Sequence, residues 1–189
     1  MSDQRLRAYV DESSVIHDSK QEYRICAVLV PSRLETELRE SLKTFLSKGQ
    51  TKFHWTQEDR RRRHRFADFI STLNLDCLVV THADERRRND ERYRRKCFEQ
   101  LYHELVTHDV STVTIEARSK AQNLLDIEHI VGLRGRGLYS NLYLTHLAGK
   151  EEPLLWMADA ILGVVNAAEL GDESYAQKFS PTALRLTST

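Results

Sequence analysis

Short runs of β-branched and aromatic residues alternate along this chain with longer segments whose apolar residues recur at helical spacing. The short runs predict strands and the longer segments predict helices. Strands are expected at 5–11, 23–30, 52–55, 76–82, 111–117 and 141–147. Helices are expected at 33–48, 56–73, 88–108, 120–131 and 152–170. Strands separated by helices indicate an α/β fold, in which helices cover a β-sheet.

The connections between these segments predict the directions of the strands. A polar, turn-rich segment, "SSVIHDSKQE", joins the first two strands, which we expect to form an antiparallel hairpin. Each later strand follows a helix, so we expect those strands to be parallel. The sheet is therefore expected to be mixed and flanked by α-helices. A length of 189 residues suits one domain, 1–189, with a C-terminal tail at about 171–189.

Composition narrows the class of protein. Charged residues make up 30% of the chain and hydrophobic residues 40%, which is typical of a globular domain in water. No apolar run is long enough to span a bilayer, and charge persists through the first ten residues, so we expect a cytoplasmic protein without a membrane partner. Cys26, Cys77 and Cys97 form no C-x-x-C pair, which argues against a disulfide framework and a zinc site.

The formal net charge is zero, but arginine is concentrated in the middle of the chain, at 60–65, 86–88 and 92–96. Arginine binds phosphate through two parallel hydrogen bonds, so these clusters suggest contact with a nucleic-acid backbone. A solvated helix face is the alternative, because acids are interspersed with the arginines. The glycine-spaced "GLRGRGLY" at 132–139 predicts a flexible loop that offers two more arginines. The candidate nucleic-acid-binding residues are Lys52, Arg61, Arg62, Arg87, Arg118, Arg134 and Arg136.

Carboxylates stand where apolar sequence ends or is interrupted. Asp11 and Glu12 follow the first predicted strand, Glu116 closes another, and Asp159 lies on an otherwise apolar helix face. Each has a structural alternative: a turn cap for Asp11, a pair with Arg118 for Glu116, and a helix N-terminus or a buried arginine for Asp159. Strand ends in an α/β sheet converge on one rim, however, and gathered carboxylates repel one another unless a cation neutralises them. Hard oxygen ligands suit magnesium or manganese.

These stretches resemble a family of bacterial proteins of unknown function that is regarded as having a ribonuclease H-like fold. The likeness spans roughly residues 6 to 170 and rests on "YVDES" here against "YxDESG", and on "WMADAILG" here against "QLADLIAG". "TKFHWTQED" is similar to the family's segment around a His or Lys, which points to Lys52 and His54. The resemblance implies a ribonuclease H-like fold and assigns the site to Asp11, Glu12 and Asp159, with Glu116 as a central acid.

Taken together, these observations predict a divalent-metal-dependent nuclease that hydrolyses phosphodiesters. Asp11, Glu116 and Asp159 would hold Mg²⁺ or Mn²⁺. Because side chains alternate along a strand, only one of Asp11 and Glu12 can face the metal directly, and we favour Asp11. His54 is a candidate general acid–base group, or else a histidine that packs its ring at a strand edge. Glu58 is a further candidate carboxylate, or an acid that favours a helix dipole.

Two other functions are compatible with the same sequence. The acids could be structural in a non-catalytic module that binds nucleic acid or a protein, and a small-molecule phosphohydrolase could use the same metal site. The predicted helix 152–170 is apolar nearly all round, so it is expected to be buried on more than one side. Either the C-terminal tail or a second subunit would cover this helix. The second alternative predicts a homodimer.

Overall fold

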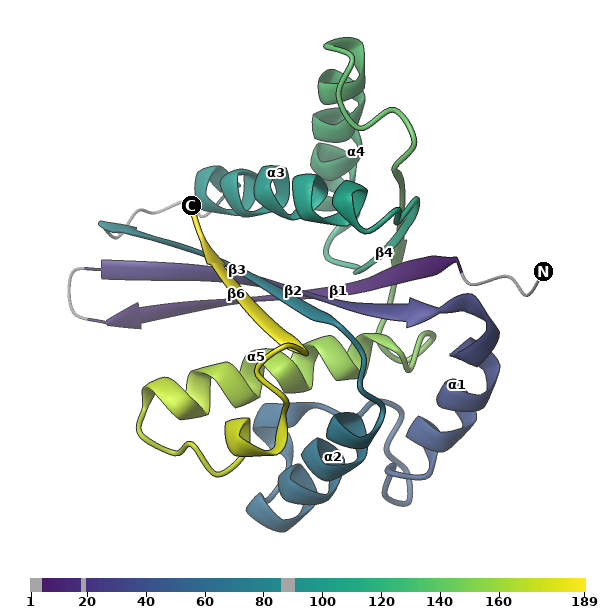
Figure 1. Cartoon of the computed structure of the whole chain (residues 1–189), viewed down its shortest axis with the longest axis vertical. Helices are drawn as coiled ribbons and strands as arrows, with labels where there is room; N and C mark the ends of the chain where they lie inside the picture. The colour runs from purple at the N-terminus through teal and green to yellow at the C-terminus, as the bar shows by residue number, and fades with distance from the viewer. Residues whose placement is uncertain (1–4, 18–19, 86–90) are drawn as a thin grey trace.

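The computed structural model describes residues 5–17, 20–85 and 91–189, and it contains a six-stranded mixed sheet with helices on both faces (Figure 1). The α/β class and the mixed sheet are confirmed. The strands are β1 (Leu6–His17), β2 (Lys20–Pro31), β3 (Cys77–Glu85), β4 (Thr112–Glu116), β5 (Tyr143–Leu147) and β6 (Leu184–Ser188). The α-helices are α1 (Glu35–Lys43), α2 (Arg60–Thr72), α3 (Glu91–Thr107), α4 (Lys120–Gly135) and α5 (Leu155–Glu169). Short 3₁₀ turns are found at Ser32–Leu34, Trp55–Gln57 and Ala176–Lys178.

The strands lie in the order β5-β4-β1-β2-β3-β6. β1 and β2 form the expected antiparallel hairpin, and β4 and β5 run parallel to β1 as expected. The expectation is wrong for β3, which pairs antiparallel with β2. Two helices, α1 and α2, lie between these strands, so the connection returns to the end of the sheet where β2 finishes. A single helix would have favoured a parallel crossover.

Two further expectations fail. The strand predicted at 52–55 is absent, and this stretch leads into the 3₁₀ turn Trp55–Gln57. Conversely, the C-terminal tail contains β6, which pairs in parallel with β3 and forms one edge of the sheet. Leu186 on β6 is 64% exposed, so this edge strand lacks the apolar content that makes a buried strand recognisable.

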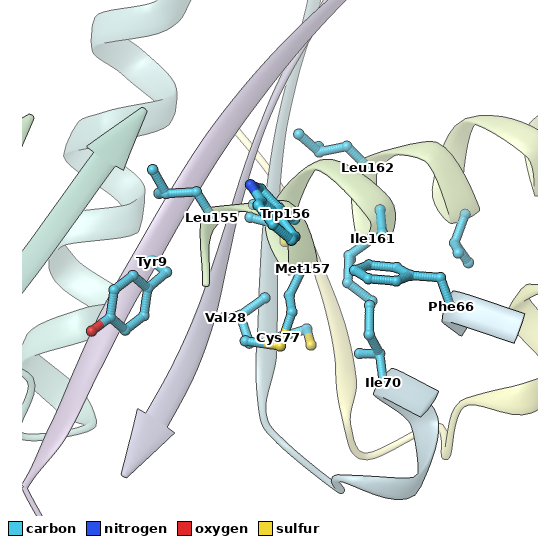
Figure 2. Packing of buried hydrophobic residues seen from close by; sticks show 14 of the residues in the cluster. Tyr9, Val28, Phe66, Ile70, Cys77, Leu155, Trp156, Met157, Ile161 and Leu162 are labelled. Atoms are coloured by element: carbon cyan, nitrogen blue, oxygen red, sulfur yellow. The ribbon is translucent and has the colours of Figure 1, made fainter. Parts of the chain in front are cut away.

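The two faces of the sheet bury separate hydrophobic clusters. Tyr9, Val28 and Cys77 lie in the cluster with α5, and α2 packs against the outer side of α5 through Phe66 and Ile70 (Figure 2). The other face packs against α3 and α4, through residues that include Val10, Ile25, Val80 and Ile115. Within the described part of the chain, no helix is long and apolar enough to cross a membrane.

α5 is covered on all sides by the chain itself. The sheet lies against one side of α5, α2 against another, and Tyr175 and Phe179 of the tail join the same cluster. The tail and α2, together with the sheet, therefore cover the apolar residues that lie around α5. A homodimer remains a prediction that the burial of α5 does not require.

β1 extends beyond the two acids that we expected to end it. β2 pairs with every residue of β1 through His17, so the ladder carries the strand past Asp11 and Glu12. The parallel pairing of β1 with β4 ends at Val10 and Ile115. The acids therefore stand at the end of the β1–β4 ladder, in the middle of a longer strand.

Gly163 of α5 makes room for the indole of Trp55. A methyl group built at Gly163 would lie 2.1–2.4 Å from three atoms of that ring. The Trp55 ring also makes an edge contact with Tyr175, with 5.0 Å between the ring centroids, so it has little freedom to move aside.

We predict that Gly163→Ala lowers the free energy of unfolding by about 1–3 kcal/mol, because the added methyl group overpacks the Trp55 contact. Denaturant unfolding followed by circular dichroism measures this. Gly132→Ala is the matched control, since a methyl group there meets nothing within 4 Å. In α4 that change should stabilise by about 0.5–1 kcal/mol through helix propensity. Equal effects of the two substitutions would contradict the packing role of Gly163.

Candidate functional site

Asp11, Glu116 and Asp159 come together from three different elements. In the β1–β4 register Val10 pairs with Ile115, so Asp11 and Glu116 are the next residues along each strand. Both point to the face that α5 covers, because side chains alternate along a strand and Tyr9 already faces α5. Asp159 lies on α5, which packs against β1. This part of the sequence-based site is therefore assembled by the fold.

The electrostatics of Asp11 show how close these groups are. The pKa of Asp11 is raised well above its ordinary value, first by burial and then by the negative charges of Glu116 and Asp159. The main-chain N–H of Glu12 donates to Asp11 Oδ1 at 2.8 Å, and the charge of Lys52 lowers the pKa in part. These two contacts favour the charged form of Asp11, but burial and the neighbouring carboxylates outweigh them.

Lys52 provides the positive charge nearest to Glu116. Its Nζ lies 2.5 Å from Glu116 Oε1. The second oxygen, Oε2, is buried and has no hydrogen-bond partner within residues 5–17, 20–85 and 91–189. The side chains of Lys52 and Glu116 are 22% and 21% exposed, so solvent and small ions can reach the pair.

Asp159 holds the segment that carries the candidate histidine. Its Oδ2 accepts a hydrogen bond from the main-chain N–H of Trp55 at 2.9 Å and lies 3.3 Å from His54 Nδ1. Asp159 thus accepts from the first N–H of the 3₁₀ turn Trp55–Gln57. This contact is similar to the helix N-terminus that the sequence analysis gave as a structural alternative for Asp159. The hydrogen bond with Asp159 is the largest cause that raises the pKa of His54, whose side chain is 39% exposed.

Glu12 lies on the opposite face of β1 and is not brought together with the other acids. Its carboxylate pairs with Arg94 Nε at 2.6 Å and with Arg118 Nε at 3.3 Å. Arg94 also pairs with the buried Asp126, and Asp126 Oδ2 accepts from His146 Nε2 at 2.8 Å if that nitrogen is protonated. This network ties α3 and α4 to the sheet, and it holds the Glu12 carboxylate apart from the other predicted catalytic acids.

Most of the predicted phosphate-binding arginines have partners inside the protein. Arg62 contacts Glu58, Ser47, Gln50 and the carbonyl of Phe45, which also places Glu58 in this structural cluster. Arg118 bonds Glu91 at 2.8 Å as well as Glu12. Arg134 donates to the Leu142 carbonyl and lies over the Tyr143 ring.

The remaining arginine predictions have different outcomes. Arg61 and Arg136 are exposed and have no side-chain partner among residues 5–17, 20–85 and 91–189. Arg87 lies outside the described residues. The expected loop at 132–139 is wrong in its first half, because α4 continues to Gly135. Of the predicted phosphate-binding arginines within the described ranges, Arg61 and Arg136 are therefore the two that remain available for a phosphate backbone.

The donor set meets one requirement for a divalent cation and lacks another. Carboxylate oxygens suit magnesium and manganese, and the unpartnered Glu116 Oε2 is a ready acceptor. Yet across the described ranges no three His, Cys, Asp or Glu side chains are arranged so that they could hold one ion together. Glu116 is turned to Lys52 and Asp159 to Trp55. A metal would need these carboxylates to change partners.

Residues that sequence reasoning missed are those whose role depends on contacts between distant elements. Gly149 lies beside Lys52 and Glu116, and a methyl group there would be 2.7 Å from Lys52 Cδ and Cε. Arg94 and Asp126 form the ion pair on the other face. Arg94 lies among apolar residues of a helix, which is a weak indication of burial. Nothing in the sequence around Gly149 indicates its contact with Lys52 and Glu116.

We predict that Asp11→Asn stabilises the metal-free protein at pH 7. The folded state binds the proton of Asp11 more tightly than the unfolded chain does, so stability falls as pH rises from the ordinary carboxyl range toward the raised pKa. The asparagine lacks this penalty, and its amide oxygen can still accept the Glu12 N–H.

Thermal unfolding across a pH series measures the difference between wild type and Asp11→Asn. The advantage of the variant should shrink below about pH 4, where both the folded and the unfolded wild type are protonated. Glu40→Gln is a control on the surface, where Glu40 pairs with Lys43 and is 69% exposed. An Asp11→Asn protein that is less stable than wild type at pH 7 would contradict the crowding of the carboxylates.

The comparisons with known proteins agree with this architecture. No protein-family model matches the sequence, and no curated protein matches it. Among solved structures, a chain of the PCNA:RNase HII complex from Archaeoglobus fulgidus superposes with a TM-score of 0.51 and 17% sequence identity. The match covers 94% of this chain and 80% of that chain. At this identity the likeness shows the fold alone, and that fold is ribonuclease H-like.

Proposed function

We propose that this protein is a divalent-metal-dependent nuclease. One observation carries the proposal: Asp11, Glu116 and Asp159 converge from β1, β4 and α5, closely enough for their charges to raise the pKa of Asp11. Such crowding is costly for a stable fold unless a cation relieves it. The fold supports the proposal, since a solved structure that is similar to this chain contains an RNase HII.

In this proposal Asp11, Glu116 and Asp159 hold Mg²⁺ or Mn²⁺. The ion would activate a water molecule and stabilise charge on the phosphate during displacement. The hydrogen bond with Asp159 raises the pKa of His54, and the ring is exposed enough to give a proton to a leaving oxygen. Arg61 and Arg136 bind the phosphate backbone, since neither is occupied by another side chain in the described residues.

Manganese should raise the melting temperature of the wild type in proportion to its affinity. At a concentration about 100-fold above Kd, binding to the folded state adds about 2.7 kcal/mol of stability, which for a chain of this size is a rise of about 5–11 °C. Asp11→Asn and Asp159→Asn should lose most of this rise and should also lose manganese-dependent cleavage of single- and double-stranded DNA and RNA. Differential scanning calorimetry and gel assays measure the two effects.

Glu12→Gln is the matched control for the manganese experiment. It changes the neighbour of Asp11, but on the face occupied by Arg94 and Arg118. We expect a lower melting temperature without metal and an unchanged response to manganese. Cleavage that survives in both aspartate variants would overturn the proposed site. No response to manganese in the wild type would favour the non-catalytic binding module, and cleavage of short phosphoesters with little salt dependence would favour a small-molecule phosphohydrolase.

Arg61 and Arg62 provide a test of the nucleic-acid contact. Arg61→Ala should weaken binding of the oligonucleotide that is cleaved and reduce the slope of log K against log salt by about 1, with little change in stability. Arg62→Ala should instead lower the free energy of unfolding by about 1–3 kcal/mol, because it leaves the buried Glu58 without this partner. Fluorescence anisotropy at several salt concentrations, in Ca²⁺ to prevent cleavage, separates the two. An unchanged slope in Arg61→Ala would exclude Arg61 from the interface.

A further inference from the structure

Lys52 acts on two carboxylates of the cluster. Its ammonium pairs with Glu116 Oε1 at 2.5 Å, and its charge also lowers the pKa of Asp11. The pair joins a loop before α2 to the end of β4, two segments far apart in the sequence. Lys52 therefore acts as a counter-ion to the cluster as a whole, beyond its contact with one carboxylate.

The chain keeps a space open for this side chain. A methyl group on Gly149 would lie 2.7 Å from both Cδ and Cε of Lys52 and 2.9 Å from Glu116 Oε1. The backbone of Gly149 is not in the left-handed region, so its conformation alone does not call for glycine. The Gly149 carbonyl accepts from Trp156 Nε1 at 2.6 Å, which fixes the loop against α5. The aliphatic part of the Lys52 side chain thus lies in space that a side chain at position 149 would overlap.

One ammonium does not occupy all the oxygens of the cluster. Glu116 Oε2 is buried and has no hydrogen-bond partner among the described residues, and the charges of Glu116 and Asp159 still act to raise the pKa of Asp11. A divalent ion carries twice the charge of an ammonium and accepts several oxygens at once. Lys52 occupies Oε1 of Glu116, so such an ion would compete with the ammonium for this carboxylate.

We propose that Lys52 is a resident counter-cation that a divalent metal ion must displace from Glu116 in order to bind. This inference rests on the proposed metal site and adds a mechanism of loading to it. With metal absent, the Lys52–Glu116 pair stabilises the folded protein. With metal bound, the ammonium leaves Glu116 and swings toward solvent on its flexible stem, because its side chain is already partly exposed.

Isothermal titration with Mn²⁺ tests the competition directly and does not depend on catalysis. Lys52→Met keeps most of the aliphatic stem and removes the charge, so its Mn²⁺ affinity should exceed that of wild type by about tenfold or more. Gly149→Ala leaves the lysine in the chain but closes its seat, and it should change affinity in the same direction. Lys43→Met is the control, since Lys43 pairs with Glu40 on the surface of α1, and its affinity should equal that of wild type.

The metal-free proteins provide a second measurement. Lys52→Met should melt below wild type without manganese and show a larger rise when manganese is added. Equal or weaker Mn²⁺ affinity in Lys52→Met would overturn the displacement while leaving the proposed metal site intact. Binding by Lys52→Met but not by wild type would support it in its strongest form. Binding by none of the proteins would overturn both the displacement and the metal site.

Discussion

The packing of α5 against β1 is the constraint on which the rest of the structure depends. It places Asp159 opposite the end of the β1–β4 ladder and presents a carboxylate to the main-chain N–H of Trp55. It also presents Gly163, whose missing side chain admits the Trp55 ring. These two contacts fix the segment around Phe53, and with it the positions of Lys52 and His54. A shift of α5 would therefore move acid, base and counter-ion together.

The acids on the two faces of β1 have different charged neighbours. Glu12 is matched by two arginines, and the network continues through Asp126 to His146. Asp11, one residue earlier, faces two further carboxylates and a single lysine. Buried ion pairs with complete partners organise a structure, whereas excess charge of one sign creates a need for a ligand. Because side chains alternate along β1, the structural acid Glu12 and the proposed metal ligand Asp11 lie on opposite faces of the sheet.

The sequence predicted those features that follow from local pattern. Strand and helix periodicity indicated the mixed α/β sheet, and alternation correctly separated Asp11 from Glu12. Prediction failed where distant contacts decide the outcome. The end of β1 depends on how far β2 continues to pair, the direction of β3 depends on two intervening helices, and β6 has too little apolar content to be recognised. The arginine pattern predicts a phosphate-binding surface, but the side chains of Arg62, Arg118 and Arg134 bond other residues of the protein. Spacing along the sequence does not reveal these contacts.

The position of β6 at the sheet edge has a consequence for how the chain folds. Cys77 of β3 pairs with Leu184, so the outer neighbour of β3 is provided by residues that are synthesised more than one hundred positions later. Until then, the hydrogen-bonding groups on that side of β3 are unpaired, and an unpaired edge is where strands from other molecules can add. Closing so long a loop carries an entropic cost that local contacts do not. The pairing of β6 therefore covers an edge of β3 that is open to self-association while the chain is being synthesised.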